Sequence, residues 1–440
     1  MREIILDISK IVFGGAGFGH VDGKACFVPF TMPGDRVRVR VVKEKGSYIE
    51  AELIELLNAS SQRIKPFCPA YGTCGGCALQ HLSYDHQLAV KEELFAEQLW
   101  RLARVDPSLI QPMRKAEHSI GYRTRVQIKV RWIDNDLKVG FYRSGTHYIE
   151  PFPGCCAIAH PAINGLVGEF PPIIREFSQP DRIPQVDITI GEDGKAIVII
   201  HYIGSTPSEA ISYFSGRRSE FPSAAGLFLQ IGRKNTLQKI WGIDRLDYVV
   251  PAPLGDDGIR ELRLGFSAGG FSQINRLQNL QLIRIVSSLS GLTGRERVLD
   301  LFCGNGNFSL PLALNSRELI GADDYAQSIA DASRNAKENN VQNVSFEAAD
   351  ATIMVQKLVS RGERFDVVIL DPPRTGSSTL MKHLTSLAPR RIIYVSCNPA
   401  TLGRDIAILK KVDYSVIRAV PVDMFPQTAH IESVTLLERD

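Results

Sequence analysis

The chain of 440 residues contains eight cysteines, and their surroundings predict two different kinds of chemistry. Cys397 follows the apolar run Ile392–Val395 and precedes Asn398 and Pro399. Such a run predicts a buried strand, and Asn-Pro predicts its end. The thiol would therefore stand at the carboxyl end of a strand, where open α/β sheets carry their reactive groups. The alternative is a small buried hydrophobic residue, which is how many single cysteines pack.

Three further thiols, Cys68, Cys74 and Cys77, lie within one short segment, and glycines stand between the last two. A closed thiolate site needs a fourth ligand, and the adjacent Cys155 and Cys156 are the paired candidates downstream. Zinc and an iron–sulfur cluster both accept four thiolates. The spacing therefore predicts a metal site without choosing between the two.

Two acidic residues are expected to share the sheet edge with Cys397. Asp371 follows the apolar run Phe365–Leu370 and precedes two prolines, which would hold it rigidly at the end of a strand. Glu432 lies at the start of the run Ile431–Leu437. If that last strand runs against the others, its start meets their ends. The alternative for Glu432 is an ordinary carboxylate at a strand end.

The last third of the chain has the pattern of a sheet that could position these groups. From about residue 297, strands alternate with helices, which predicts βαβ units and a mostly parallel sheet. The run Val298–Phe302 leads into the turn Cys303-Gly-Asn-Gly-Asn307, and the next strand ends in Asp323. Glycines let a nucleoside cofactor approach the backbone, and the acid is placed for ribose hydroxyls. Ser309 replaces the third glycine of a dinucleotide fingerprint, which disfavours NAD and favours S-adenosylmethionine.

Short strands in residues 1–60 predict a small OB-like β-barrel, with a turn over the glycine-rich run 14–19. Arg36, Arg38 and Arg40 alternate with valines, so one face of their strand is basic and the other is buried. A barrel with a cationic face is typical of nucleic-acid binding. The alternative is a solvated strand that is rich in arginine.

A central α+β domain is expected at 61–264, entered through a helix over 83–102, and a third domain at 265–440. Its clearest strand is Tyr122–Trp132, which carries four cations on one face and could follow phosphates; here too a solvated face is the alternative. Further strands are expected at Lys138–Tyr142, Val186–Ile190, Ala196–Tyr202 and Gly226–Ile231.

The bulk composition limits the class of protein. The net charge is +3, so any nucleic acid would be bound by local patches rather than by the whole surface. The N-terminus lacks a basic segment followed by an apolar core, and no apolar run is long enough to span a bilayer. We therefore expect a cytoplasmic monomer that has no membrane partner.

The chain resembles the RNA uracil-C5 methyltransferases over nearly its whole length. The motifs that carry this resemblance are Asp300-Leu-Phe-Cys-Gly-Asn-Gly-Asn307, Asp371-Pro-Pro-Arg374, Ser396-Cys-Asn-Pro-Ala-Thr401 and His430-Ile-Glu-Ser433. The barrel resembles the TRAM domain, an RNA-binding barrel, through its glycine-rich run and Thr31–Val37. The resemblance implies an N-terminal TRAM barrel, a central domain with a [4Fe–4S] cluster, and a Rossmann-like domain that transfers a methyl group from S-adenosylmethionine to a uridine in RNA. Having both barrel and cysteines favours 23S rRNA over tRNA.

The resemblance also implies roles for individual residues. Cys397 would be the nucleophile that adds to C6 of the uracil ring, and Glu432 the base that removes the C5 proton. We expect nearby donors or positive charge to lower the pKa of Cys397, because the thiolate is the nucleophile. The cluster ligands would be Cys68, Cys74, Cys77 and Cys156. Cys156 is preferred to Cys155 because Pro161 follows it at the interval seen in the family.

The cofactor site implied by the resemblance depends on a larger set of residues. These are Gln273, Phe302, Gly304, Asn307, Asp323, Asp350 and Asp371. Asp323 stands where the family has a glutamate, and Asp350, a candidate for the adenine edge, stands where an asparagine is common. Both side chains can still accept hydrogen bonds.

Two other functions compete with this interpretation. RNA cytosine-C5 methyltransferases share the fold but carry a second cysteine after the proline of the fourth strand, where this chain has Pro373 and Arg374. A non-catalytic RNA-binding or iron–sulfur protein would not need Cys397 and Glu432 at one sheet edge.

Overall fold

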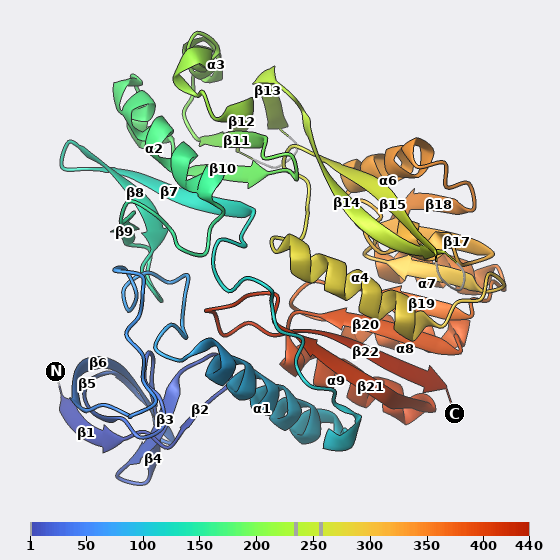
Figure 1. Cartoon of the computed structure of the whole chain (residues 1–440), viewed down its shortest axis with the longest axis horizontal. Coiled ribbons are helices and arrows are strands. Elements are labelled where there is room, and N and C mark those ends of the chain that lie inside the picture. Colours follow the sequence, from blue (N-terminus) through green and yellow to red (C-terminus); the bar gives the residue numbers. More distant parts are fainter. Residues whose placement is uncertain (1, 233–235, 255–257, 440) are drawn as a thin grey trace.

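The protein has three regions, arranged as Figure 1 shows: a small barrel and a mixed sheet on one side, and a larger α/β domain on the other. The computed structural model describes residues 2–232, 236–254 and 258–439. No helix in these described ranges is long and apolar enough to cross a membrane.

The N-terminal barrel is a six-stranded sheet in the order β1-β5-β6-β4-β3-β2. Its strands are β1 (Glu3–Asp7), β2 (Lys10–Ile11), β3 (Gly17–Val21), β4 (Lys24–Val28), β5 (Arg36–Glu44) and β6 (Tyr48–Asn58). The turn expected over 14–19 is wrong in its second half, which belongs to β3. Gly17 and Gly19 serve there because a Cβ would collide with Thr31 at the first position and with the Asp7 backbone at the second.

The arginines of β5 lie on one face as predicted, but acidic neighbours neutralise them. Arg38 forms an ion pair with Glu55 on β6 at 3.0 Å, and Arg36 forms one with Asp7 on β1 at 3.5 Å. The valines between the arginines are buried in the core of the barrel. On this face Arg36 and Arg38 are therefore charge-compensated, as in the solvated strand that the sequence left open as the alternative.

Helix α1 (Tyr84–Ala103) connects the barrel to the central domain, close to the predicted range. The central sheet has the order β13-β12-β11-β10-β7-β8-β9. Its strands are β7 (Arg125–Ile133), β8 (Asp136–Tyr142), β9 (Ile149–Pro151), β10 (Gln185–Ile190), β11 (Ala196–Tyr202), β12 (Ala224–Ile231) and β13 (Leu237–Gly242). Helices α2 (Pro161–Glu176) and α3 (Pro207–Ser215) pack their apolar sides on this sheet. The strands predicted in this region are confirmed.

The hairpin of β14 (Arg245–Leu254) and β15 (Gly258–Ser267) leaves the central sheet and packs against the α/β domain. Its buried residues, such as Val250 and Leu264, belong to the same core as the helices of that domain. The boundary predicted at residue 264 therefore falls within β15, because the hairpin was not foreseen.

The α/β domain has a seven-stranded sheet in the order β18-β17-β16-β19-β20-β22-β21. Its strands are β16 (Arg297–Leu301), β17 (Glu318–Asp323), β18 (Val344–Ala348), β19 (Val367–Leu370), β20 (Arg391–Ser396), β21 (Tyr414–Val422) and β22 (Glu432–Arg439). The first five in chain order are parallel, and β22 is antiparallel to both β20 and β21. This is the parallel sheet and final antiparallel pair that the sequence predicted.

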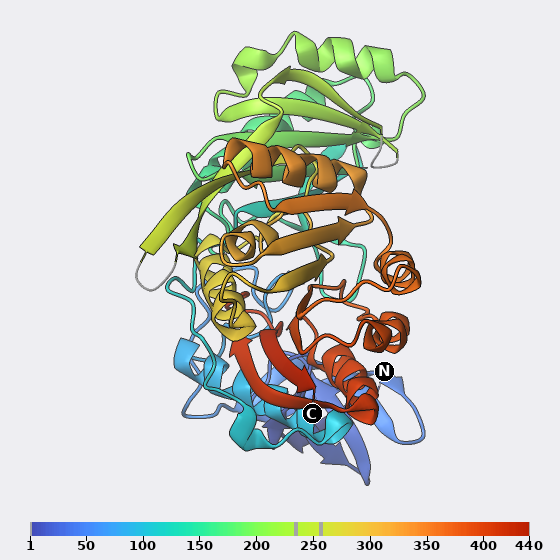
Figure 2. The same cartoon turned by 90° about the vertical axis from the view of Figure 1, so that its right-hand side faces the viewer.

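Helices cover both faces of this sheet (Figure 2). One face holds α4 (Arg276–Ser290), α5 (Ser309–Ala313), α6 (Ala326–Glu338) and the β14–β15 hairpin. The other face holds α7 (Ala351–Ser360), α8 (Ser378–Leu384), α9 (Pro399–Leu409) and also α1. Because α1 shares this core, the linker helix is part of the α/β domain in packing terms.

Candidate active site

Strands β20 and β22 bring Cys397 and Glu432 to the same edge of the sheet. In this antiparallel pair Ser396 lies opposite Ser433, and Cys397 follows the first of these residues while Glu432 precedes the second. Both Cys397 and Glu432 line one cavity, and the charge of Glu432 acts on the Cys397 thiol. The structure therefore places the predicted nucleophile beside the predicted base.

Helix α9 and the segment after β19 fix the surroundings of Cys397. Asn398 caps α9, where its Oδ1 accepts a hydrogen bond from the Ala400 N–H at 3.1 Å. The Asn398 amide and the Thr401 hydroxyl both donate to the carbonyl oxygen of Arg374 at 3.3 Å. The Asp371–Arg374 segment is thereby held against the thiol.

A cavity of about 530 Å³ opens at this edge. Cys397, Glu432 and Asp371 stand in its wall together with most of the predicted cofactor residues. Those that line it are Gln273, Phe302, Gly304, Asn307, Asp323 and Asp371. Its size suits a nucleoside cofactor.

The turn after β16 is shaped for close approach to a ligand. Phe302 and Gly304 adopt positive φ values of 66° and 55°. Asp323 receives hydrogen bonds from the backbone N–H of Gly304 at 3.0 Å and of Tyr325 at 2.9 Å. These bonds orient the carboxylate, which has further lone pairs for ribose hydroxyls. Asn307 is held by its side-chain bonds to Asn279.

Asp350 is the predicted cofactor residue that the structure does not bring to the cavity wall. Its carboxylate caps α7 and accepts hydrogen bonds from the N–H groups of Thr352 at 2.8 Å and Ile353 at 3.1 Å. Aspartate is a preferred N-cap residue, so this helix alone accounts for its position.

The acids of the cavity do not titrate like exposed carboxyls. Burial raises the pKa of Asp371 to about 7, and the negative charge of Asp323 adds to the shift. Burial raises the pKa of Glu432 well above its usual value, with a further contribution from Asp371. Behind the cofactor turn, burial raises the pKa of Asp300 to about 7, although Ser309 donates a hydrogen bond to it.

The expectation of a lowered pKa for Cys397 is wrong for the protein without ligands. The pKa of this thiol is raised to about 11; burial is the largest cause, and the nearby charges of Glu432 and Asp371 contribute to the same rise. Arg374 acts in the opposite direction but is outweighed. The carboxyls of Glu432 and Asp371, which line the same cavity as Cys397, therefore disfavour its thiolate.

Arg374 and His430, to which the sequence analysis gave no role, also stand in this site. A second cavity of about 230 Å³ shares Cys397 and Arg374 with the first and continues past His430 towards the barrel. Burial lowers the pKa of His430 to about 4, so its ring is neutral at physiological pH. Both residues lie inside motifs of the family resemblance, at the end of Asp371-Pro-Pro-Arg374 and the start of His430-Ile-Glu-Ser433. Their place in these motifs was the signal from which a role in the site could have been predicted.

The loop from Asp423 to Ile431, which leads into Glu432, is anchored by distant parts of the chain. The backbone N–H groups of Ala78 and Leu79, beside the cysteines, donate to the Gln427 carbonyl at 2.9 and 3.0 Å. The Gln87 side chain on α1 exchanges two hydrogen bonds of 2.9 Å with Gln427. The linker helix and the cysteine loop are therefore tied to the loop that leads into the predicted base.

The same loop contains a buried ion pair. The Lys91 ammonium on α1 donates to Asp423 at 2.6 Å and to the Phe425 carbonyl at 3.0 Å. Both charged side chains are almost fully buried, with 1% and 0% exposed. Phe425 in turn stands in the wall of the larger cavity.

The four predicted cluster cysteines lie near one another. The pKa of Cys77 is raised to about 12; burial is the largest cause, and the charges of Cys156, Cys74 and Cys68 contribute to the same rise. Cys155, the neighbour of Cys156, is exposed. Among the described residues, no group of three or more His, Cys, Asp or Glu side chains is arranged to hold a single metal ion. A four-iron cluster makes a different demand, because each of its thiolates binds a separate iron.

Comparisons with known proteins agree on one group of enzymes. The family described as tRNA (Uracil-5-)-methyltransferase matches residues 83–440, and the TRAM domain family matches residues 2–54. The chain is 33% identical to the 23S rRNA (uracil(1939)-C(5))-methyltransferase RlmD of Alkalilimnicola ehrlichii, covering 98% of this chain and 96% of that protein. It is 35% identical to the protein of the same name from Pseudomonas putida, covering 98% and 93%.

A solved structure supports the same grouping over the whole length. The tRNA (uracil-54, C5)-methyltransferase of Pyrococcus abyssi, determined with S-adenosyl-L-homocysteine, superposes with a TM-score of 0.73 at 25% identity. The match covers 99% of this chain and 100% of the other.

Proposed function

The chain belongs to the family of S-adenosylmethionine-dependent RNA uracil-C5 methyltransferases, and on that premise we propose that its substrate is one uridine of 23S rRNA. The names of the relatives from A. ehrlichii and P. putida support this choice of RNA. The observation that carries the chemistry is the cavity in which Cys397 and Glu432 stand beside the cofactor turn. We also propose that the enzyme works in the cytoplasm as a monomer.

Uracil C5 is a weak nucleophile, and Cys397 would activate it. The thiolate adds to C6, which moves electron density to C5 and the adjacent carbonyl oxygen. S-adenosylmethionine, when bound, supplies the methyl group that C5 takes up, and its sulfonium brings positive charge into the cavity. Loss of the C5 proton then allows the Cys397–C6 bond to break, which releases 5-methyluridine and the free thiolate.

The raised pKa values give the two carboxyls complementary roles. A protonated carboxyl of Glu432 or Asp371 can donate a hydrogen bond to the carbonyl oxygen as its charge develops. Once ionised, a buried carboxylate with a raised pKa is a strong base. Glu432 lines the same cavity as Cys397 and would therefore take the C5 proton.

The four cysteines Cys68, Cys74, Cys77 and Cys156 would hold a [4Fe–4S] cluster. The convergence of their thiols supports a shared ligand, and the family membership supports iron. Their place next to Gln427 means that a cluster would hold the loop that carries Glu432, which is a structural role rather than a step of the reaction.

The RNA assignment is tested by mapping 5-methyluridine in total RNA from cells that lack the protein. We expect one site in 23S rRNA to lose its methyl group and to regain it with the wild-type protein but not with Cys397→Ala. Loss of the modification from tRNA alone would show that the substrate follows the P. abyssi neighbour instead. Unchanged RNA, or rescue by Cys397→Ala, would refute the proposed chemistry.

The cluster is tested with a pair of neighbouring cysteines. Cys156→Ser should lose most of the iron and the visible absorption of an anaerobically purified protein, whereas Cys155→Ser should keep both. Equal iron content in the two variants would contradict the assignment of Cys156, and iron-free wild-type protein would contradict the cluster.

A further inference from the structure

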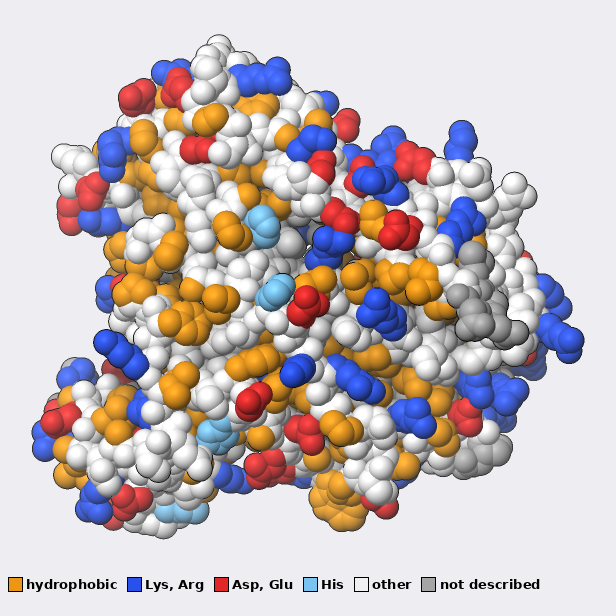
Figure 3. Space-filling model, viewed as in Figure 1, with side chains coloured by type: hydrophobic (Ala, Val, Ile, Leu, Met, Phe, Trp, Pro, Cys, Tyr) orange, Lys and Arg blue, Asp and Glu red, His pale blue; other side chains and the backbone are white. Residues whose placement is uncertain are grey.

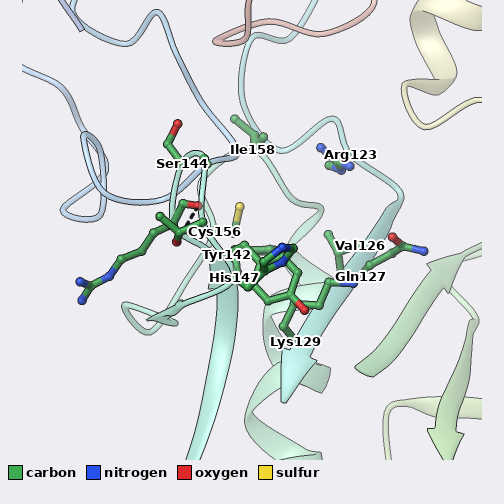
Figure 4. Close-up of a pocket in the computed structure, with 15 residues that line it drawn as sticks. Arg123, Val126, Gln127, Lys129, Tyr142, Ser144, His147, Cys156 and Ile158 are labelled. Atoms are coloured by element: carbon green, nitrogen blue, oxygen red, sulfur yellow. Dashed lines mark hydrogen bonds between the residues drawn. The ribbon is translucent and has the colours of Figure 1, made fainter. Parts of the chain in front are cut away.

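A third cavity, of about 450 Å³, lies between the β7–β8 hairpin and the cysteine loop (Figure 4). Its wall combines aromatic and cationic side chains. The Tyr142 and His147 rings lie together in the middle of this view, with Lys129 on one side and the Cys156 sulfur on the other. Arg123 stands at the edge of the same cavity.

Lys129 and His147 both lie close to the Tyr142 ring. The Lys129 ammonium lies 5.2 Å from the centre of the Tyr142 ring, and the His147 ring meets that ring edge-on at 5.6 Å. Within the described residues neither Lys129 nor Arg123 forms an ion pair, so their charges are not neutralised as those of β5 are. Aromatic faces beside uncompensated cations are the combination that binds nucleotides of single-stranded RNA.

Backbone hydrogen bonds hold the wall of this cavity in place. The Gly75 N–H donates to the Tyr142 carbonyl at 2.9 Å, and the Ser144 N–H donates to the Thr73 carbonyl at 3.1 Å. A Cβ on Gly75 would lie 3.0 Å from the Tyr142 oxygen, so this close docking suits glycine. The cysteine loop thus holds the end of β8 and its aromatic side chain in place.

The cavity also adjoins the active site. It shares Gly75, Gly76 and Ser144 with the smaller cavity that contains Cys397. Three of the four cluster cysteines, Cys68, Cys74 and Cys77, are absent from its lining. It is therefore not the space between the four thiols but a neighbouring compartment on the path away from Cys397.

We propose that this cavity binds one nucleotide of the RNA that lies close to the target uridine. The base stacks on Tyr142 and His147, and Lys129 and Arg123 face the phosphate backbone. This inference rests on the proposed function, since it takes RNA as the substrate. It adds a recognition site for a flanking nucleotide to the site that holds the reacting one.

The experiment measures binding of an RNA fragment that contains the methylated uridine, in the presence of S-adenosylhomocysteine. Single abasic nucleotides are placed in turn at the positions on either side of that uridine. For the wild-type protein we expect one position at which the missing base weakens binding roughly 5- to 100-fold, the usual effect of losing one stacked base.

Tyr142→Ala should weaken binding of the intact RNA by a similar factor and should no longer respond to the missing base at that position. Tyr142→Phe keeps the aromatic face and should behave like the wild type. Lys129→Gln should lower the dependence of log K on log salt by about one charge, whereas Arg131→Gln, on the same strand but outside the cavity, should leave the base-specific loss unchanged. Thermal unfolding of each variant controls for folding.

The proposal is overturned if Tyr142→Ala binds the intact RNA as tightly as the wild type, or if it still senses the same missing base. Methylation by the wild-type protein is measured on the same fragments. If the wild type methylates the RNA but shows no Tyr142-dependent base, the pocket assignment fails and the proposed function stands. If it methylates tRNA instead, the rRNA assignment fails, and the same set of variants is applied to the tRNA fragment.

Discussion

Replacing Glu432 by Gln should have opposite effects on two steps of the reaction. The change removes a carboxyl that, once ionised, places negative charge beside Cys397, and it keeps the size of the side chain. Both residues line one cavity. Burial contributes more than Glu432 to the rise of the Cys397 pKa from 9.0 to about 11, so removing this charge should recover about one pKa unit.

The pKa of Cys397, about 11 in the wild type, should therefore fall towards roughly 10 in Glu432→Gln. It should not fall to the value of a free thiol, because burial and Asp371 still oppose ionisation. At pH 8 the thiolate fraction would rise about tenfold, but a thiolate of lower pKa is a weaker nucleophile, so alkylation should accelerate about threefold.

The rate of alkylation is measured with iodoacetamide between pH 7 and 11, and mass spectrometry of the peptide that contains Cys397 separates it from the other thiols. Glu438→Gln is the matched control, since Glu438 lies at the far end of the same strand and pairs with Arg391 at 2.6 Å. It should leave the Cys397 profile unchanged.

The same Glu432→Gln variant should be unable to complete turnover. With no base for the C5 proton, methylated RNA should stay bonded to Cys397 and appear as a slow band on a denaturing gel. Loss of a general base lowers rates by roughly 10²- to 10⁴-fold. An unchanged or higher pKa for Cys397 would refute the electrostatic reasoning, and release of product at the wild-type rate would refute the role of Glu432.

Two further predictions concern stability. Asp300 has a folded pKa of about 7, above its unfolded value near 4, so it destabilises the fold increasingly as pH rises from about 4 to 7. Asp300→Asn should therefore raise the free energy of unfolding by up to about 4 kcal/mol at pH 8 and by almost nothing at pH 4. The measurement is a urea titration at each pH. An equal gain in the free energy of unfolding at both pH values would contradict this cause. Lys91→Met leaves Asp423 buried without its partner and should cost about 3 to 5 kcal/mol, much of it restored by adding Asp423→Asn, and a Lys91→Met protein as stable as the wild type would count against the buried ion pair.

The parts of the fold that sequence could predict are those set by local patterns. The strand before Cys397 and the strand before Asp371 are short apolar runs closed by prolines or Asn-Pro, and both lie where they were expected. Parallel strands align their carboxyl ends, so the shared edge followed from the pattern of elements. The helix predicted over 83–102 is α1, which begins directly after its N-cap residue Ser83.

The parts that sequence could not predict depend on residues far apart in the chain. From the sequence alone, the β5 arginines predict a basic face. In the fold, acids of β1 and β6 lie opposite them. The raised pKa of Cys397 arises from burial and from two carboxyls on other strands. Asp350 was assigned to the cofactor by analogy, whereas the local demand of a helix N-terminus decides where its carboxylate lies.

The hydrogen bonds to Gln427 have a consequence for how this enzyme can be divided. Hydrogen bonds that hold the loop before Glu432 come from α1, from the cysteine loop and from the α/β domain itself. A fragment that kept the whole parallel sheet and the cofactor turn would still lack the first two of these supports. The position of Glu432 thus depends on parts of the chain that lie outside the parallel sheet.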